Sequence, residues 1–234
     1  MNIAWAITGA GCYLRESVES MEKIAKNNKV TVFLSKSGEE VIKAYGLWER
    51  LAKIAPGDYL QEIFSEHEQG ASSPSAGRFF LKRYDALVVS PATTNTVAKI
   101  AHGISDTLVT NAVSNAMKSR VPVYVCPSDR IIKDTRVLLP CYIDRITCRK
   151  CSRCLPVINC EQKAIENYSI NLLKCNSCGA CIAACEYGAV VGGKKVKMRV
   201  RKIDHDNVKR IENMEFIKII KNPGKIQKLL LGNC

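Results

Sequence analysis

Between residues 148 and 185 the sequence contains Cys148-Arg-Lys-Cys151-Ser-Arg-Cys154 and Cys175-Asn-Ser-Cys178-Gly-Ala-Cys181, each followed by a further cysteine. Three thiolates with C-x2-C-x2-C spacing can bind three irons of one [4Fe–4S] cluster, and the fourth cysteine then reaches the other cluster. The pattern therefore predicts crossed ligation. The first cluster would be bound by Cys148, Cys151, Cys154 and Cys185. The second would be bound by Cys175, Cys178, Cys181 and Cys160.

The same stretch resembles the bacterial-type two-cluster ferredoxins over residues 143–193. In its second half, Gly179 and Ala180 are small enough for the backbone to approach the sulfides; in its first half, five residues including Pro156 separate Cys154 from Cys160. Zinc ribbons use pairs of C-x2-C rather than triplets, and four disulfides in so short a stretch would be typical of a secreted scaffold. The resemblance implies a small α+β ferredoxin-like iron–sulfur domain.

The composition is typical of a globular protein of a reducing compartment. Hydrophobic residues make up 47% of the 234 residues, and charged residues 24%. No apolar stretch reaches the roughly 18 residues of a membrane-spanning helix, and the N-terminus lacks the basic segment of a signal peptide. Twelve cysteines, eight of them at ligand spacing, indicate a reducing interior. We therefore predict a cytoplasmic protein without a membrane segment.

The formal charge of +13 is concentrated near the C-terminus. Residues 186–234 contain 12 Lys and Arg against 5 Asp and Glu, whereas residues 1–128 contain 14 against 12. Two bound clusters would lower the total to about +9. No nucleic-acid-binding motif accompanies the basic segment. We expect no nucleic-acid partner, and favour an acidic redox carrier, an anionic substrate or simple solubility as the reason for the charge.

Before the cysteines, apolar runs alternate with helical patterns. Four runs have the continuous hydrophobicity of strands that are buried on both faces: 3–7, 30–34, 85–90 and 121–126. Four segments have helical periodicity: 14–25, 39–45, 97–102 and 106–117. Alternating strands and helices predict an α/β domain with a doubly wound parallel sheet.

Polar and glycine-rich segments follow the predicted strands. The first strand ends in Thr8-Gly9-Ala10-Gly11, and the second ends in Ser35-Lys36-Ser37-Gly38. A strand, a glycine turn and a helix together place backbone N–H groups around a phosphate. Hydroxyl groups at the carboxyl end of a strand also suit a phosphate or a ribityl chain. Residues 66–77 are predicted to form a loop, either a lid over the site or a surface loop, and His67 at its edge is more often incidental than catalytic.

After the third strand the sequence reads Pro91-Ala92-Thr93-Thr94-Asn95-Thr96, which resembles the P-A-S-A-N-T segment of a flavoprotein family. That family includes flavin prenyltransferases and cysteine decarboxylases. The likeness continues through Ala98–Gly103 and Asp106 and covers residues 1–128. It implies a flavodoxin-like fold that binds FMN at the C-terminal edge of the sheet. By position it implies FMN contacts from Thr8, Gly9, Ala10, Ser35, Thr94, Asn95 and Thr96.

One segment departs from the decarboxylases of this family. They have P-x-M-N-x-x-M-W after the last central strand, whereas this chain has Pro122-Val-Tyr-Val-Cys126-Pro-Ser128. Decarboxylation of a cysteinyl substrate is therefore disfavoured. We predict that Cys12 and Cys126 are inert core thiols, and no pattern marks Cys141 as a ligand.

The residues after Cys185 predict a basic segment that packs on the flavin domain. Ala189–Val191, the Gly192-Gly193 turn and Val196–Val200 are expected to form a hairpin. Helices are expected at 207–220 and 224–231. We divide the chain into an FMN-binding domain (1–140), a two-cluster domain (141–195) and a basic C-terminal segment (196–234).

The combination of parts predicts an oxidoreductase, because clusters pass single electrons whereas FMN collects two and delivers a hydride. It resembles the archaeal iron–sulfur flavoproteins of methanogens, of the dihydromethanopterin reductase (acceptor) type. This resemblance implies that electrons pass from a ferredoxin-like or other one-electron donor through both clusters to FMN. They then reduce a dihydropterin, giving tetrahydromethanopterin. It also implies a homo-oligomer, a trimer or larger. An electron relay for another enzyme and a flavin-dependent decarboxylase or transferase remain as alternatives, and no catalytic acid is identified.

Overall fold

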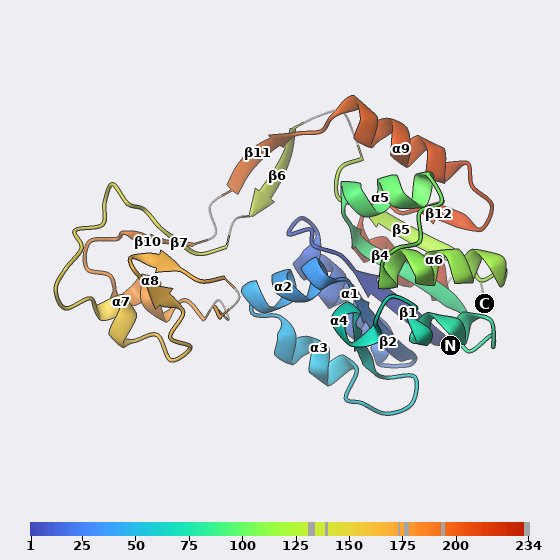
Figure 1. Ribbon diagram of the computed structural model, residues 1–234, viewed down its shortest axis with the longest axis horizontal. Coiled ribbons are helices and arrows are strands. Elements are labelled where there is room, and N and C mark those ends of the chain that lie inside the picture. The colour runs from blue at the N-terminus through green and yellow to red at the C-terminus, as the bar shows by residue number, and fades with distance from the viewer. Residues whose placement is uncertain (131–133, 139, 173, 176–177, 193–194, 232–234) are drawn as a thin grey trace.

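The computed structural model describes residues 1–130, 134–138, 140–172, 174–175, 178–192 and 195–231. Two bodies are seen in Figure 1, joined by a two-stranded ribbon. We call the larger one, formed by residues 1–130 and 202–231, the sheet domain. The smaller one, formed by residues 141–192, is the cysteine domain.

The sheet domain is built on six parallel strands. They are β1 (Asn2–Ile7), β2 (Lys29–Leu34), β3 (Ile63–Ser65), β4 (Ala86–Ala92), β5 (Val123–Pro127) and β12 (Ile217–Ile219). Their spatial order is β12-β5-β4-β1-β2-β3. Without the three-residue edge strand β3, the order is the 2-1-3-4-5 of flavodoxin-like sheets. The predicted doubly wound parallel sheet is therefore confirmed.

Helices cover both faces of this sheet, as a doubly wound fold requires. One face is covered by α1 (Leu14–Ala25), α2 (Lys36–Ala44), α3 (Trp48–Ile54) and α10 (Ile226–Leu231), and the other by α5 (Thr94–Ala101), α6 (Leu108–Lys118) and α9 (Lys202–Glu212). The expected loop at 66–77 instead contains α4 (Glu66–Gln69) and part of the 3-10 helix η1 (Pro74–Phe79). Within the described ranges, no helix is long and apolar enough to cross a bilayer.

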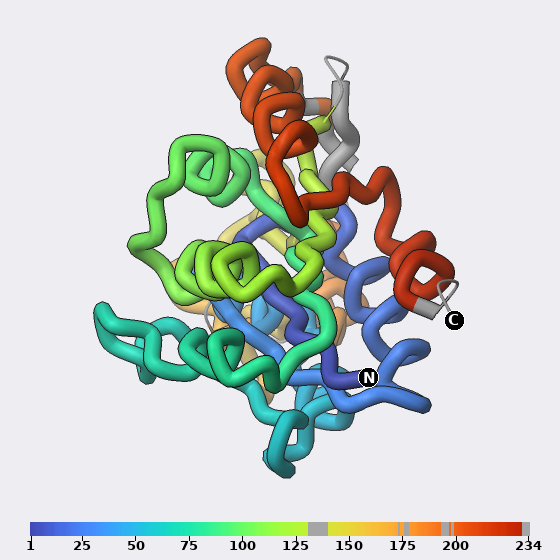
Figure 2. Tube along the Cα trace, turned by 90° about the vertical axis from the view of Figure 1, so that its right-hand side faces the viewer, coloured from blue at the N-terminus to red at the C-terminus, as the bar shows by residue number. Residues whose placement is uncertain are grey.

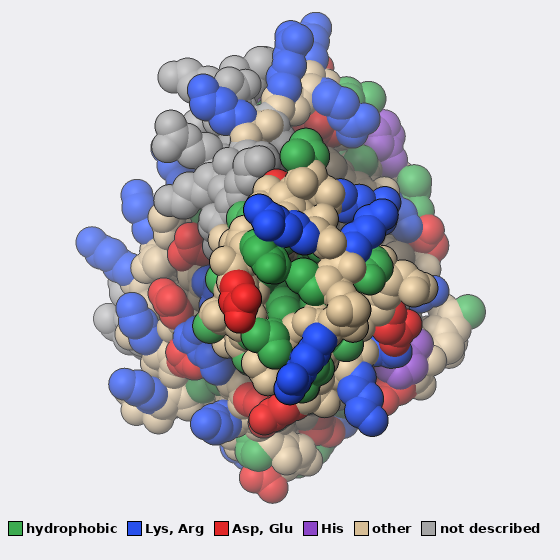
Figure 3. Space-filling model, turned by 90° about the vertical axis from the view of Figure 1, so that its left-hand side faces the viewer, with side chains coloured by type: hydrophobic (Ala, Val, Ile, Leu, Met, Phe, Trp, Pro, Cys, Tyr) green, Lys and Arg blue, Asp and Glu red, His purple; other side chains and the backbone are tan. Residues whose placement is uncertain are grey.

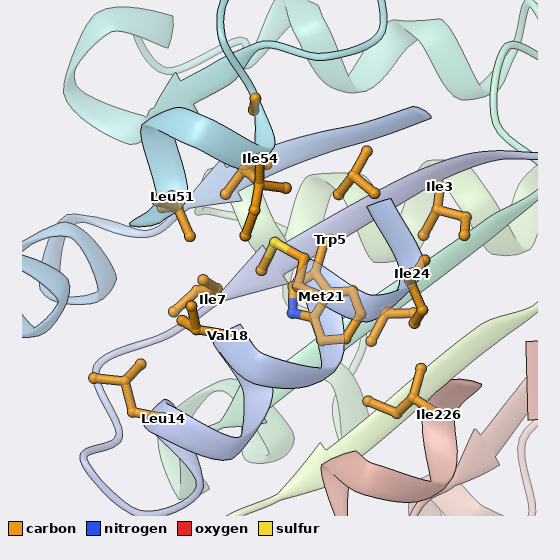
Figure 4. Packing of buried hydrophobic residues seen from close by; sticks show 14 of the residues in the cluster. Ile3, Trp5, Ile7, Leu14, Val18, Met21, Ile24, Leu51, Ile54 and Ile226 are labelled. Carbon is orange, nitrogen blue, oxygen red and sulfur yellow. The ribbon is translucent and has the colours of Figure 1, made fainter. Parts of the chain in front are cut away.

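The core explains why β1 is apolar at every position from residue 3 to residue 7. Ile3, Trp5 and Ile7 pack under α1, whereas Ala4 and Ala6 face α5 and α6. Small residues on the second face leave room for those helices. Trp5 lies beside Met21 of α1 (Figure 4), and its indole N–H donates to the carbonyl of Ser90 at 2.9 Å. A strand buried on both faces needs no polar alternation.

The C-terminal residues complete the sheet domain. Helix α9 packs on α5, strand β12 pairs with β5, and the 3-10 helix η2 (Pro223–Lys225) and α10 pack on α1. The red part of the chain in Figure 2 follows this path across the domain. The helix expected over 207–220 is thus wrong beyond Glu212. Ile217–Ile219 form a strand because the exposed edge of β5 supplies their hydrogen-bond partners.

Among its described residues, the cysteine domain contains two short antiparallel pairs and two short helices. Strand β7 (Tyr142–Ile143) pairs with β10 (Val190–Val191), and β8 (Ile165–Glu166) pairs with β9 (Ser169–Ile170). In the sequence, helix α7 (Leu155–Ile158) lies between β7 and β8, and helix α8 (Ala180–Ala184) lies between β9 and β10.

The ribbon is formed by β6 (Asp134–Leu138) and β11 (Lys195–Arg199), which pair antiparallel. The hairpin expected between 189 and 200 is therefore wrong, because β10 and β11 each pair with a strand that precedes the cysteines. Gly193 of its predicted turn lies outside the described residues. The cysteine domain is inserted between β5 and β12 of the sheet domain.

Candidate functional site

The carboxyl ends of three neighbouring strands form the first candidate site. Strand β1 pairs with β2 on one side and with β4 on the other. The chain moves from β1 outward to β2, and later returns to the far side of β1 with β4. A crevice forms at such a reversal of strand order, outside the carboxyl ends of the strands. The loops that begin at Thr8, Ser35 and Thr93 meet there.

Thr8 connects two of these loops. Its buried hydroxyl donates to the carbonyl of Pro91 at 2.8 Å and accepts the backbone N–H of Thr93 at 2.8 Å. Its own N–H donates to the Pro91 carbonyl at 3.2 Å. The structure thus places Thr8 at the predicted site, with its hydroxyl directed at the neighbouring loop.

Two helices begin at this edge with matching side-chain caps. Ser35 Oγ accepts the N–H of Gly38 at 3.0 Å, and Thr93 Oγ1 accepts the N–H of Thr96 at 3.2 Å. The first two helical residues, Lys36–Ser37 in α2 and Thr94–Asn95 in α5, have backbone N–H groups without intrahelical acceptors. Such N–H groups, together with the positive end of the helix dipole, favour an anion.

Glycines allow the loops to approach one another closely. A Cβ on Gly9 would lie 2.6 Å from Ser37 Oγ, and one on Gly38 would lie 2.3 Å from the carbonyl oxygen of Ile7. Sequence reasoning did not single out Thr93, Ser37 or Gly38 as site residues. At both helix starts, a hydroxyl residue stands three positions before the residue whose N–H it accepts. This spacing in the sequence could have identified both starts.

The thiols of Cys12 and Cys126 lie near this edge of the sheet domain, and the raised pKa of each keeps it in its unreactive, protonated form. Cys126 is completely buried, and burial raises its pKa to about 12. Burial and the nearby Asp129 raise the pKa of Cys12 to about 11. Both stay protonated at neutral pH, as expected for inert thiols. His67 is exposed, with Nδ1 3.1 Å from Glu39 Oε2.

The eight cysteines of the repeated pattern line two cavities of the cysteine domain. The first cavity, of about 430 Å³, is lined by Cys148, Cys151, Cys154 and Cys185, together with Arg149 and Arg153. The second, of about 10 Å³, is lined by Cys160, Cys175, Cys178 and Cys181, and also by Cys141. Each cavity thus combines one triplet with the fourth cysteine of the other half. Among the described residues, no three His, Cys, Asp or Glu side chains converge as for a single metal ion.

Cys160 and Cys185 each accept a backbone hydrogen bond from the alanine four residues later, despite their different spacers. Cys160 Sγ accepts the N–H of Ala164 at 3.3 Å, and Cys185 Sγ accepts the N–H of Ala189 at 3.3 Å. The five residues between Cys154 and Cys160 are accommodated by α7, which begins directly after Cys154. The longer spacer therefore does not remove Cys160 from its cavity.

Two protein families match separate parts of the chain, the second of them only the later half of the cysteine domain. A family described as Flavoprotein matches residues 1–139, and one described as 4Fe-4S binding domain matches residues 168–191. The dihydromethanopterin reductase (acceptor) of Methanosarcina mazei is 47% identical, over 97% of this chain and 98% of its own. The protein of the same name from Methanocaldococcus jannaschii is 43% identical, over 97% and 94%.

A solved structure has the same overall arrangement. The FMN complex of Burkholderia xenovorans DmrB, described as a cubic protein cage for redox transfer, matches with a TM-score of 0.64 and 25% identity. The match covers 99% of this chain and 93% of that one. From these matches, the chain belongs to the flavoprotein family, and within it to the group of full-length relatives that includes the two dihydromethanopterin reductases (acceptor).

Proposed function

We propose that this protein is an oxidoreductase that reduces dihydromethanopterin to tetrahydromethanopterin with electrons from an external one-electron donor. The observation that carries the proposal is the identity of 47% and 43% to reductases of that name along nearly the whole chain. Both parts of the chain are included in these matches, so the likeness is not confined to one cofactor domain.

In this proposal the cysteine domain holds two [4Fe–4S] clusters with crossed ligation. The lining of the two cavities supports this assignment, because each is lined by one triplet and the fourth cysteine of the other half. Thiolates are the usual ligands of such clusters. The N–H groups of Ala164 and Ala189 would stabilise the thiolates of Cys160 and Cys185 by hydrogen bonding.

The edge of the sheet domain would hold FMN. Its phosphate fits the N-termini of α2 and α5, where Ser35 and Thr93 cap the helices and leave the next two N–H groups for the ligand. We assign the contacts to Gly9, Ala10, Ser35, and the α5 residues Thr94, Asn95 and Thr96, while Thr8 positions the loops. The sequence lacks a complete G-x-G-x-x-G fingerprint, which favours one phosphate over a dinucleotide.

When bound, the clusters transfer single electrons and FMN accumulates two of them for transfer as a hydride. The helix starts capped by Ser35 and Thr93 would orient the bound flavin relative to the pterin. Two electrons and two protons are consumed for each C=N bond reduced. Solvent supplies the proton on nitrogen in this scheme.

An acidic one-electron donor would dock on the cysteine domain beside the first cavity. Arg149 and Arg153 line that cavity and are exposed, and their sequence neighbours Arg145, Lys150 and the 96% exposed Ile146 are exposed as well. On this face, basic side chains lie above and below a central group of apolar ones, and an acidic side chain lies beside it (Figure 3). Complementary charge would steer an acidic carrier to the first cluster.

We also propose that the protein forms a homo-oligomer, a trimer or larger. Burkholderia xenovorans DmrB, which matches along nearly the whole chain, is described as a cubic cage. Light scattering of the purified protein tests this point, and a monomer would contradict it.

The proposed activity is tested with protein that is purified anaerobically and photoreduced. Mixing it with dihydromethanopterin should reoxidise the flavin and yield an equivalent amount of tetrahydromethanopterin, measured by chromatography. NADPH without a one-electron carrier should support little turnover, because the chain lacks a nicotinamide-binding fingerprint. If the flavin stays reduced with the dihydropterin but is oxidised rapidly by another redox protein, the chain is an electron relay instead.

A further inference from the structure

The second cavity of the cysteine domain contains one thiol more than a four-iron cluster requires. Five cysteines line it, whereas four line the first cavity. The additional thiol is that of Cys141, which directly precedes β7 and lies outside both triplets.

The pairing of β7 with β10 positions Cys141 beside the second cavity. Tyr142 of β7 pairs with Val191 of β10, so that Cys141 lies opposite Gly192. A Cβ on Gly192 would lie 2.9 Å from Cys141 Sγ and 2.7 Å from Ile182 Cδ1. The sulfur is therefore close to α8, the helix that contains Cys181. Glycine at position 192 leaves the space that this thiol occupies.

The internal repeat shows that this fifth thiol is specific to the second cavity. A shift of 27 residues, from Cys148 to Cys175, superimposes the triplets and also maps β7 onto β9. The same shift maps Cys141 onto Tyr168, whose hydroxyl lies 3.5 Å from the Lys150 carbonyl oxygen in the first triplet. The position that bears a thiol beside one triplet thus bears a phenol beside the other.

We propose that Cys141 is a reserve ligand of the second cluster, able to replace Cys160 when that thiolate is lost. The inference rests on the proposed function, which supplies the clusters. Cys160 is the ligand to be replaced because the other three are constrained by their common triplet, whereas Cys160 comes from a separate segment after α7. The exchange is redox-neutral. The Cys141 thiol releases its proton to solvent and forms an S–Fe bond, while the Cys160–Fe bond breaks and that sulfur is protonated.

The test compares four variants of the full-length protein purified anaerobically: Cys141→Ala, Cys160→Ala, the double variant Cys141→Ala/Cys160→Ala, and Cys185→Ala. Iron and sulfide per chain are measured, together with EPR spectra of the oxidised and reduced protein. FMN content reports whether the sheet domain is folded. Cys185→Ala is the matched control, because its sulfur has the same N–H contact as Cys160 but its cavity has no fifth cysteine.

Cys141→Ala and Cys160→Ala should each retain about eight irons and two [4Fe–4S] signals, with an altered second signal in Cys160→Ala. The double variant and Cys185→Ala should lose iron and show a three-iron signal or none for the affected cluster. If Cys160→Ala loses as much iron as the double variant, Cys141 is not a reserve ligand. Loss of iron in Cys141→Ala alone would also overturn the proposal, because Cys141 would then be a permanent ligand. Wild-type protein without about eight irons would instead contradict the proposed function.

Discussion

At the scale of single residues, the sheet-domain site depends on side chains that hold loops together. Thr8 is the clearest example, because its one hydroxyl connects the end of β1 with the Pro91 carbonyl of β4 and with the Thr93 N–H directly after that strand. Ser35 and Thr93 act similarly on the first turns of α2 and α5. These residues prearrange the N–H groups that would bind the FMN phosphate.

Replacing Thr8 by Val should therefore damage both stability and cofactor binding. Val has nearly the same shape but leaves the partly buried Thr93 N–H without its acceptor, at a cost of about 1–3 kcal/mol. FMN affinity, measured by fluorescence quenching, should fall about tenfold or more, since 1.4 kcal/mol corresponds to a factor of ten. Thr8→Ser keeps the hydroxyl and is the control, which should bind FMN nearly as wild type. Equal affinity of the Val and Ser variants would show that the hydroxyl does not order the loop.

At the scale of elements, α2 can approach β1 only because Gly38 has no side chain. The Cβ of any other residue there would meet the carbonyl oxygen of Ile7 at 2.3 Å, and neither backbone segment can move without disturbing the sheet. The helix N-terminus is thereby brought to the loop of the neighbouring strand. The close contact between the backbones of Gly38 and Ile7 thus sets the position of the α2 N-terminus at the proposed phosphate site.

Gly38→Ala should shift α2 away from β1 and destabilise the protein by about 1–3 kcal/mol, as overpacking of a core does. Urea unfolding followed by tryptophan fluorescence measures this change, because Trp5 is buried in the same core. Gly77→Ala is the matched control. No heavy atom would lie within 4 Å of that Cβ, so its stability should change by less than about 0.5 kcal/mol. A Gly38→Ala protein as stable as the control would contradict the packing argument.

At the scale of the whole molecule, the cysteine domain is an insertion in a continuous sheet domain. The chain leaves after β5 through β6 and returns through β11, where Asp134 and Arg199 pair in register. It then adds α9, β12 and α10, whose inward residues Val208, Ile211, Ile217 and Ile226 are buried in the sheet-domain core.

Two shortened chains should therefore behave differently. Replacing residues 134–199 by a short Gly/Ser linker should leave a folded sheet domain that binds FMN and contains no iron, because the two ends of the ribbon are adjacent. A chain that ends at residue 200 keeps the cysteines but exposes the apolar surface under α9 and α10, and it should aggregate. Solubility, FMN content and iron content distinguish the two. A soluble, FMN-binding chain ending at residue 200 would show that the C-terminal residues are dispensable.

The sequence by itself determined the features that depend on local chemistry. Continuous apolar runs predicted buried parallel strands, and the order of strands and helices predicted their arrangement. Cysteine spacing predicted the grouping of thiols that the two cavities display, since three ligands of each cluster lie within seven residues of sequence. The position of Ser35 directly after a strand likewise followed from the strand pattern.

Only the tertiary structure decided which distant segments pair. Residues 217–219 form the short segment Ile-Lys-Ile, whose pattern fits a helix as well as a strand. They form a strand because they pair with the free edge of β5. The predicted hairpin is wrong because β10 and β11 pair with strands about fifty residues or more away in sequence. Such pairing depends on hydrogen bonds between distant segments, which local strand propensity does not predict. Cys141 has no spacing that marks it, and it belongs to the second cavity because β7 pairs with β10. Contacts of this kind are set by packing across the chain, which no local sequence window contains.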